Sequence, residues 1–186
     1  MKPSDLKDGE CPLHKQKPEV IEEENWFFKL SKYKKEIKKI IESGNLKILP
    51  AHRSNEILNL LDDAEDVSFS RPRKGLEWGI PVPNDNTQTI YVWADALVNY
   101  ISAIGYADET EQFKKLWPAD IHLVGKDIAR FHAIIWPAML IAANLPLPKQ
   151  IFIHGFINVE GEKMSKTVGN VIDPFLILEK YGVDPV

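Results

Sequence analysis

Short apolar segments alternate with helical patterns from residue 68 onward, and this alternation restricts the fold most. Strands are predicted at 89–93, 121–124 and 151–156, because these runs are rich in Val, Ile, Phe and Tyr. Helices are predicted at 95–104, 108–116 and 126–143, and Pro137 should kink the last of these or mark a break near Ile135. Strands that alternate with helices indicate an α/β fold whose parallel sheet is covered on both faces.

The first third of the chain has a different pattern. Pro and Gly interrupt residues 1–24, and this pattern predicts a loop with short extended pieces. Apolar residues at helical spacing predict helices at 26–43 and 54–63, the second capped by Ser54, and Gly44 is a plausible stop for the first. A final helix is predicted with Asp173 as its cap and Pro174 at its first position.

Ligands of such sheets bind outside the carboxyl ends of the strands. Trp93, Gly125 and Phe156 are expected at three of these ends. Beyond the last strand, Lys163 and Lys166 lie on a polar run between Gly161 and Gly169. Two ammonium groups on a loop with glycine at both ends could close over a polyphosphate, whereas the plainer interpretation is a solvated hairpin tip.

Composition excludes several classes of protein. The net charge of −4 gives no global sign of nucleic-acid binding, although a local basic patch would be compatible with it. A single cysteine argues against a disulfide framework and fits a cytoplasmic location. No apolar run approaches the ~20 residues of a membrane span.

Seven motifs, in this order and spacing, resemble those of methionyl-tRNA synthetases. They are EEENWFF at 22–28, WGIPVP at 78–83, YVWADAL at 91–97, GKDI at 125–128 with FH at 131–132, WPAML at 136–140, HGF at 154–156 and KMSKT at 163–167. Thr167 replaces the serine that is commoner in this family. The resemblance extends from about Cys11 to Val186.

The resemblance implies a fragment of a catalytic region. Residues 1–65 would be the tail of a connective, zinc-knuckle domain, and residues 66–186 the second half of a Rossmann-like nucleotide-binding fold. The first half of that fold, with its own ATP-binding signature, would be a missing N-terminal partner.

The family activates methionine with ATP and Mg²⁺ and then esterifies tRNA(Met), so these are the implied substrates and partners. Lys163 and Lys166 would be the catalytic residues. Residues implied for ATP binding are Gly125, Asp127, His154, Lys163, Ser165 and Lys166. Asp127 as a helix cap and His154 as a structural histidine are the alternatives.

The resemblance also implies an apolar pocket for the methionine side chain, although ordinary core packing would explain the same residues. The pocket residues are Trp93, Ala96, Leu97, Tyr100, Ile128 and His132. Cys11 and His14 have the spacing of one half of a zinc site, and the family has a branch in which an upstream Cys pair supplies the other half. A lone loop cysteine is the alternative.

Two further functions stay open at this point. One is another class I synthetase, for leucine, isoleucine, valine or cysteine. The other is a non-catalytic module that keeps a cleft for an adenylate.

Overall fold

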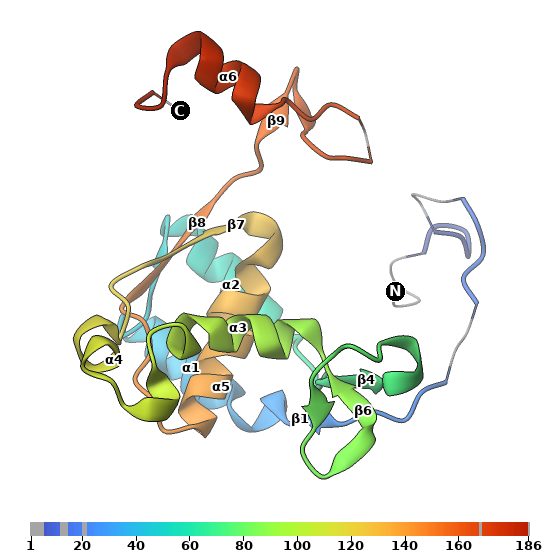
Figure 1. Cartoon of the computed structure of the whole chain (residues 1–186), viewed down its shortest axis with the longest axis vertical. Helices are drawn as coiled ribbons and strands as arrows, with labels where there is room; N and C mark the ends of the chain where they lie inside the picture. The colour runs from blue at the N-terminus through green and yellow to red at the C-terminus, as the bar shows by residue number, and fades with distance from the viewer. Residues whose placement is uncertain (1–5, 12–14, 20–21, 168, 186) are drawn as a thin grey trace. The chain divides into compact units, whose positions relative to one another are not determined.

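A computed structural model describes residues 6–11, 15–19, 22–167 and 169–185. Two compact units alternate along the chain (Figure 1). Residues 1–28 and 68–91 form one, here called the insert unit, and residues 29–67 and 92–186 form the other, the sheet unit. The domain boundary predicted between residues 65 and 66 stays a prediction.

The sheet unit is built on three parallel strands. They are β2 (Lys47–Leu49), β7 (His122–Gly125) and β8 (Gln150–His154), with β8 in the centre. Ile151 of β8 pairs with Ile48 on one side and with His122 on the other. Helices flank the sheet (Figure 1), so the predicted α/β class with a parallel sheet is confirmed. Strand β2 was not predicted.

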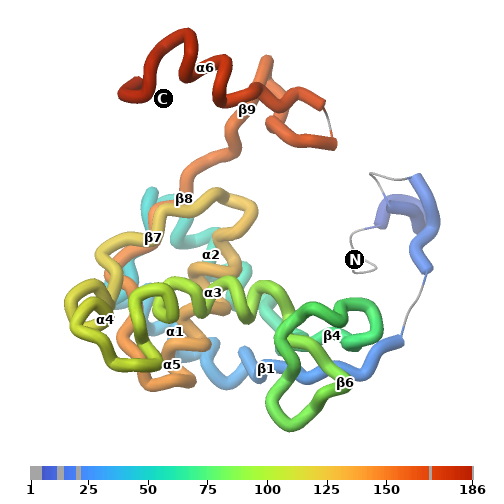
Figure 2. The backbone as a smooth tube through the Cα atoms, in the orientation of Figure 1, coloured from blue at the N-terminus to red at the C-terminus, as the bar shows by residue number. Residues whose placement is uncertain are grey.

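Between β7 and β8 the chain runs through a helical segment, whose course can be followed in Figure 2, and this segment changes pitch. A 3-10 turn at Lys126–Ile128 leads to a π-helix at Phe131–Ile135 and then to α5 (Trp136–Ala142). Pro137 has no N–H to donate, and its ring would crowd the carbonyl four residues earlier in a regular α-helix. The wider π-turn before it relieves this conflict. The helix therefore changes from π to α pitch after Ile135 but does not break there, because Ile135 and Trp136 keep helical backbone angles.

The sheet has one buried face and one exposed face. Val124, Ile151 and Ile153 are buried, whereas their neighbours Leu123 and Phe152 are 67% and 36% exposed. Successive side chains of a strand point to opposite faces, and Leu123 and Phe152 are partners in the register. The expectation that both faces are covered is therefore wrong for the described residues.

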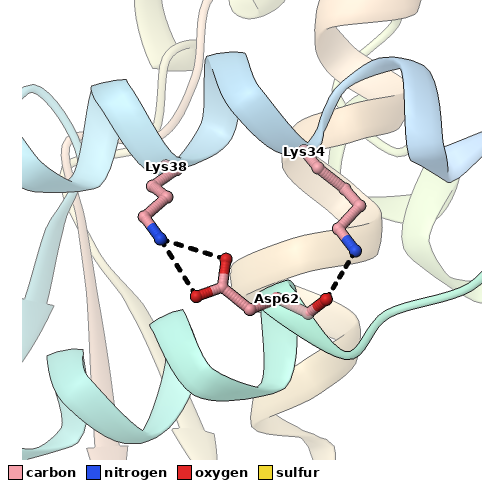
Figure 3. A network of polar contacts seen from close by, with 3 residues as sticks. All are labelled: Lys34, Lys38 and Asp62. Atoms are coloured by element: carbon pink, nitrogen blue, oxygen red, sulfur yellow. Dashed lines mark hydrogen bonds and ion pairs between the residues drawn. The ribbon is translucent and has the colours of Figure 1, made fainter.

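Helices α1 (Lys34–Glu42) and α2 (His52–Asp62) pack on each other through buried isoleucines and leucine, at Ile37, Ile41, Ile57 and Leu61. Figure 3 shows the polar contacts that join the two helices. Lys38 Nζ lies 3.0 Å from both carboxylate oxygens of Asp62, and Lys34 donates to the Asp62 carbonyl at 2.7 Å.

Two predictions about these helices are wrong. The first helix does not begin at residue 26, because β1 (Phe27–Phe28) and a 3-10 turn (Leu30–Lys32) precede it. Ser54 does not cap α2, since the helix begins two residues earlier and its N-cap position, Ala51, has no side-chain cap.

The insert unit holds an antiparallel sheet. Its strands are β4 (Ser70–Pro72), β5 (Pro81–Val82) and β6 (Asp85–Ile90), with β6 central. The strand predicted at 89–93 therefore ends early, because α3 (Val92–Ser102) begins where it was expected to continue. The buried side chains Ala94, Leu97 and Ile101 follow helical spacing, which draws residues 92–94 into the helix. Trp93 is thus not at the end of a parallel strand.

The remaining elements are short. They are β3 (Val67–Ser68), 3-10 turns at Arg73–Gly75 and Tyr106–Asp108, α4 (Glu111–Leu116), β9 (Asn158–Val159), β10 (Glu162–Lys163) and α6 (Pro174–Tyr181). The predicted cap of α6 is confirmed, because the Asp173 carboxylate accepts from the Phe175 N–H at 2.9 Å. Within the described residues, no helix has the length and apolar character that crossing a membrane requires.

Candidate active site

The carboxyl ends of β7 and β8 bring three of the predicted ATP-binding residues together. Gly125 and His154 are partners in the register. A Cβ atom on Gly125 would lie only 2.9 Å from Asp127 Oδ1 and 3.6 Å from His154 Cε1. The absence of a side chain at Gly125 therefore lets the Asp127 carboxylate fold back over the strand end.

Helix α2 holds the turn that carries Asp127. Glu56 lies between two cations, 2.7 Å from Arg53 Nη1 and 3.5 Å from Lys126 Nζ. The hydrogen bond from Arg53 is the main reason why the pKa of Glu56 is below its ordinary value, and Lys126 adds to the effect. These residues and Asp127 line a cavity of about 190 Å³. Neither Arg53 nor Glu56 was singled out from the sequence.

The lysine run begins in the hairpin of β9 and β10, whose turn contains Glu160 and Gly161 at positive φ, and continues beyond it. Lys163 Nζ lies 3.8 Å from Asp127 Oδ2 and 3.8 Å from the centre of the Phe156 ring. Both charged side chains are about half exposed, at 50% and 56%, so the pair is weakly held and can exchange for another partner. The hairpin thus brings Lys163 to the strand ends.

Asn170 closes the rest of this loop. Its Oδ1 accepts from the Ser165 N–H at 2.8 Å, and its Nδ2 donates to the Lys163 carbonyl at 3.2 Å. Lys166 is exposed, and in the part of the chain that the structure describes no carboxylate pairs with it. The structure therefore brings Lys163, and not Lys166, to Asp127. Asn170 was not predicted, and only its place after Gly169 could have identified it.

Aromatic rings form a cluster between α3 and the π-helix. Trp93 stacks on Phe131 with ring centres 3.9 Å apart and an interplanar angle of 13°. His132 lies edge-on to Trp93 at 6.4 Å and to Tyr100 at 5.6 Å. Three of the predicted pocket residues, Trp93, Tyr100 and His132, thus lie in one cluster. Phe131 was missed, although its position next to His132 in a shared motif could have identified it.

The hydrogen bonds of His132 define its tautomer. Ile128 contributes a carbonyl oxygen, which can only accept, so His132 Nδ1 carries the proton of their 2.9 Å bond. Nε2 of the neutral ring then accepts from the Tyr100 hydroxyl at 2.8 Å. Burial lowers the pKa of His132 and raises that of Tyr100. Both groups are therefore neutral near pH 7.

A second histidine extends this cluster and was not predicted. His122 Nε2 accepts from the Trp136 indole N–H at 3.3 Å, and the His122 ring lies 4.3 Å from Tyr100. Burial, with a smaller contribution from His132, lowers the pKa of His122 to about 4. Trp136 follows His132 by four residues in the helical segment, and this spacing could have identified it.

The other predicted pocket residues lie in different environments. Leu97 is 1% exposed and belongs to the core. Ala96 is exposed on α3, three residues from Trp93 and four from Tyr100, which places it on their side of the helix. Ile128 is partly exposed and contributes its carbonyl to His132.

Only one of the two predicted zinc ligands, Cys11, lies in the part of the chain that the structure describes. Cys11 is buried in a turn closed by backbone hydrogen bonds, Cys11 N to Gln16 O at 2.9 Å and Lys15 N to Cys11 O at 2.7 Å. His14 lies outside the described residues. Among the residues that are described, no three His, Cys, Asp or Glu side chains come together as a metal site. The zinc half-site stays a prediction.

Comparisons with known proteins agree with one another. All of residues 1–186 match the family described as tRNA synthetases class I (M). The methionine–tRNA ligase of Brucella suis biovar 1 is 52% identical over 89% of this chain and 32% of its own length. That of Thermotoga maritima is 49% identical over 97% of this chain and 29% of its own length.

The chain is also similar to solved structures of methionyl-tRNA synthetases. Mycobacterium tuberculosis methionyl-tRNA synthetase in complex with methionyl-adenylate matches with a TM-score of 0.80 and 43% identity, over 87% of this chain and 32% of that chain. The chain spans about a third of the length of the curated relatives it matches.

Proposed function

Since this chain belongs to the family of class I tRNA synthetases (M), we propose that it is part of a methionine–tRNA ligase and contributes to its ATP and methionine sites. One observation carries the proposal. Three separate segments supply Gly125 with Asp127, His154, and Lys163, and these residues meet at the carboxyl ends of β7 and β8, where ligands of parallel sheets bind.

In the first step, the methionine carboxylate attacks the α-phosphate of ATP, and pyrophosphate leaves as methionyl-adenylate forms. Asp127 accepts hydrogen bonds from the ribose hydroxyls beside Gly125. Lys163 then exchanges its weak pair with Asp127 for the phosphates, and Lys166 joins it there. Lysine suits this task because its charge is compact and its stem is flexible.

Mg²⁺ would accompany ATP and neutralise phosphate charge. The chain fits this assignment, because Mg²⁺ bound with a nucleotide takes most of its ligands from phosphates and water and needs one or two carboxylates. Asp127 is a carboxylate at the strand ends.

The methionine side chain occupies the aromatic cluster. Trp93 and Phe131 offer ring faces and edges to the thioether sulfur, a contact worth about 0.3–1.5 kcal/mol. Tyr100 and His132 satisfy each other by a hydrogen bond, so they present an uncharged wall to an uncharged side chain. This wall favours methionine over amino acids with charged side chains.

In the second step, the adenylate esterifies the 3′ end of tRNA(Met), and this reaction belongs to the cytoplasm, where translation occurs. The first half of the nucleotide-binding fold has to come from outside this chain. The exposed face around Leu123 and Phe152 is the natural surface for it, because a parallel sheet is stable when both faces are covered.

Zinc in the complete protein is a separate proposal. Cys11 and His14 would supply two of four ligands, with the other two from outside this chain. Metal analysis of the intact protein tests it, and a folded protein without zinc would contradict it.

Methionine-dependent ATP–pyrophosphate exchange tests the ligase proposal. The chain is assayed alone and with a separately produced N-terminal half, and we expect exchange only in the mixture. Lys163→Met should lower the exchange rate by about 10²-fold or more, whereas Lys115→Met, at an exposed lysine on α4, should not change it.

Two results would favour the alternatives. Exchange with leucine, isoleucine, valine or cysteine in place of methionine would indicate another class I synthetase. A folded mixture that binds a methionyl-adenylate analogue without any exchange would indicate a non-catalytic module.

A further inference from the structure

The insert unit exposes a tryptophan that no other ring of the described residues covers. Trp78 is 85% exposed, compared with 58% for Trp26, 7% for Trp117 and 1% for Trp136. Each of those three donates its indole N–H to an acceptor. Among the described residues, Trp78 has neither a stacked ring nor an acceptor for its N–H. A large flat apolar surface is therefore open to solvent.

The segment that carries Trp78, residues 73–80, is held firmly and is here called the Trp78 loop. Its backbone closes two successive turns, Leu76 N to Arg73 O at 2.8 Å and Gly79 N to Leu76 O at 3.2 Å. The fully buried Thr89 donates its hydroxyl to the Leu76 carbonyl at 3.3 Å, and any Cβ on Gly79 would collide with its methyl group. The indole is thus displayed on an ordered platform.

Two cations belong to the same loop. Arg73 and Lys74 line an open cavity of about 540 Å³ together with Glu77 and Thr87. In the part of the chain that the structure describes, no carboxylate pairs with either cation. The cavity therefore has two unpaired positive charges against one negative charge, and its net charge suits an anionic ligand.

We propose that the Trp78 loop binds the unpaired end of an RNA strand. An exposed ring stacks on a nucleobase of any sequence, and neighbouring Arg and Lys side chains contact the phosphates. A duplex is a poor match, because its bases already stack on each other. The proposal rests on the proposed function in one respect, since the tRNA 3′ end would then be the natural occupant.

Fluorescence anisotropy with a labelled single-stranded RNA of ten nucleotides tests this surface on the folded chain. Trp78→Ala should weaken binding by about 5- to 140-fold, the effect of removing one stacked base contact. Trp78→Phe should retain most of the affinity. The matched control is Phe175→Ala, which removes a ring that is 75% exposed on α6, and it should bind as the unchanged chain does.

The cations are tested by the salt dependence of the same binding. Arg73→Ala with Lys74→Ala should reduce the slope of log K against log salt by about 1.4, since each phosphate contact on a single strand contributes ~0.7. Lys35→Ala with Lys39→Ala removes two exposed lysines from α1 and should leave the slope unchanged.

Several results would overturn the proposal. They are equal binding by the Trp78→Ala and Phe175→Ala variants, equal affinity for a duplex, and no effect of Trp78→Ala in the longer polypeptide, where another segment would then cover the ring. If Trp78→Ala does not fold, quenching of Trp78 fluorescence by added RNA, measured as the difference from Trp78→Phe, decides instead. The exchange assay contains no RNA, so its failure would contradict the ligase proposal without affecting this one.

Discussion

Acidification from about pH 7.5 to about pH 5 should destabilise the chain by about 2 kcal/mol through His122 alone. In the folded state His122 stays neutral down to about pH 4, because it is buried beside His132. In the unfolded state it takes up a proton below about pH 6.5. Between these values the unfolded chain binds more protons, so stability is fully present above pH 6.5 and falls as the pH falls.

The magnitude follows from the two pKa values. One pKa unit corresponds to about 1.4 kcal/mol, so the complete contribution is about 3 kcal/mol, and roughly two thirds of it is lost by pH 5. His132 acts in the same direction, because its pKa is also lowered by burial. Among the described residues, no carboxylate contributes to either shift.

Urea unfolding at several pH values, followed by tryptophan fluorescence, measures this dependence. His122→Gln keeps an acceptor for the Trp136 N–H and cannot titrate in this range, so its stability should vary with pH by about 2 kcal/mol less than that of the unchanged chain. Parallel curves for the two proteins would refute the reasoning. A pKa of His122 near 6.5, measured by NMR in the folded chain, would do the same.

Three further changes have distinct expected results. Gly125→Ala should weaken ATP binding by about tenfold or more in the complemented enzyme, because the added Cβ crowds Asp127 Oδ1 at 2.9 Å; an unchanged KM for ATP would contradict this. Gly79→Ala should cost about 1–3 kcal/mol in urea unfolding, since its Cβ collides with Thr89, and a neutral effect would show that the loop yields. Leu123→Lys should change the stability of this chain by no more than about 0.5 kcal/mol, yet it should reduce exchange in the mixture with the N-terminal half; undiminished complementation would show that this face is not the contact surface.

Local signals in the sequence predicted much of the fold. The strands at 121–124 and 151–156 and the cap at Asp173 depend on nearby residues, and the structure confirms them. Pro137 also marked the place where the helix changes pitch, although the helix does not break there. The motif order also predicted the family, which the match over the whole chain confirms. Strand β2 was missed because three residues carry no periodicity, and it forms only because β8 lies beside it.

The site was harder to predict, because its geometry depends on distant segments. The spacing of Lys163 and Lys166 indicated a phosphate-binding loop but not which lysine meets Asp127, since the turn of the hairpin decides this. The roles of the ATP-binding and pocket residues stay predictions. The stack of Phe131 on Trp93 joins two helical segments, and no local pattern contains it.

The π-helix at Phe131–Ile135 is equivalent to an α-helix with one residue inserted. Deleting one residue there would restore α-helical pitch and turn everything before it by about 100° relative to everything after it. Phe131 and His132 would then rotate away from Trp93 and Tyr100, although the composition of the chain would hardly change. In evolutionary terms, the gain or loss of a single codon in this turn is enough to make or break the contacts of Phe131 and His132 within the aromatic cluster.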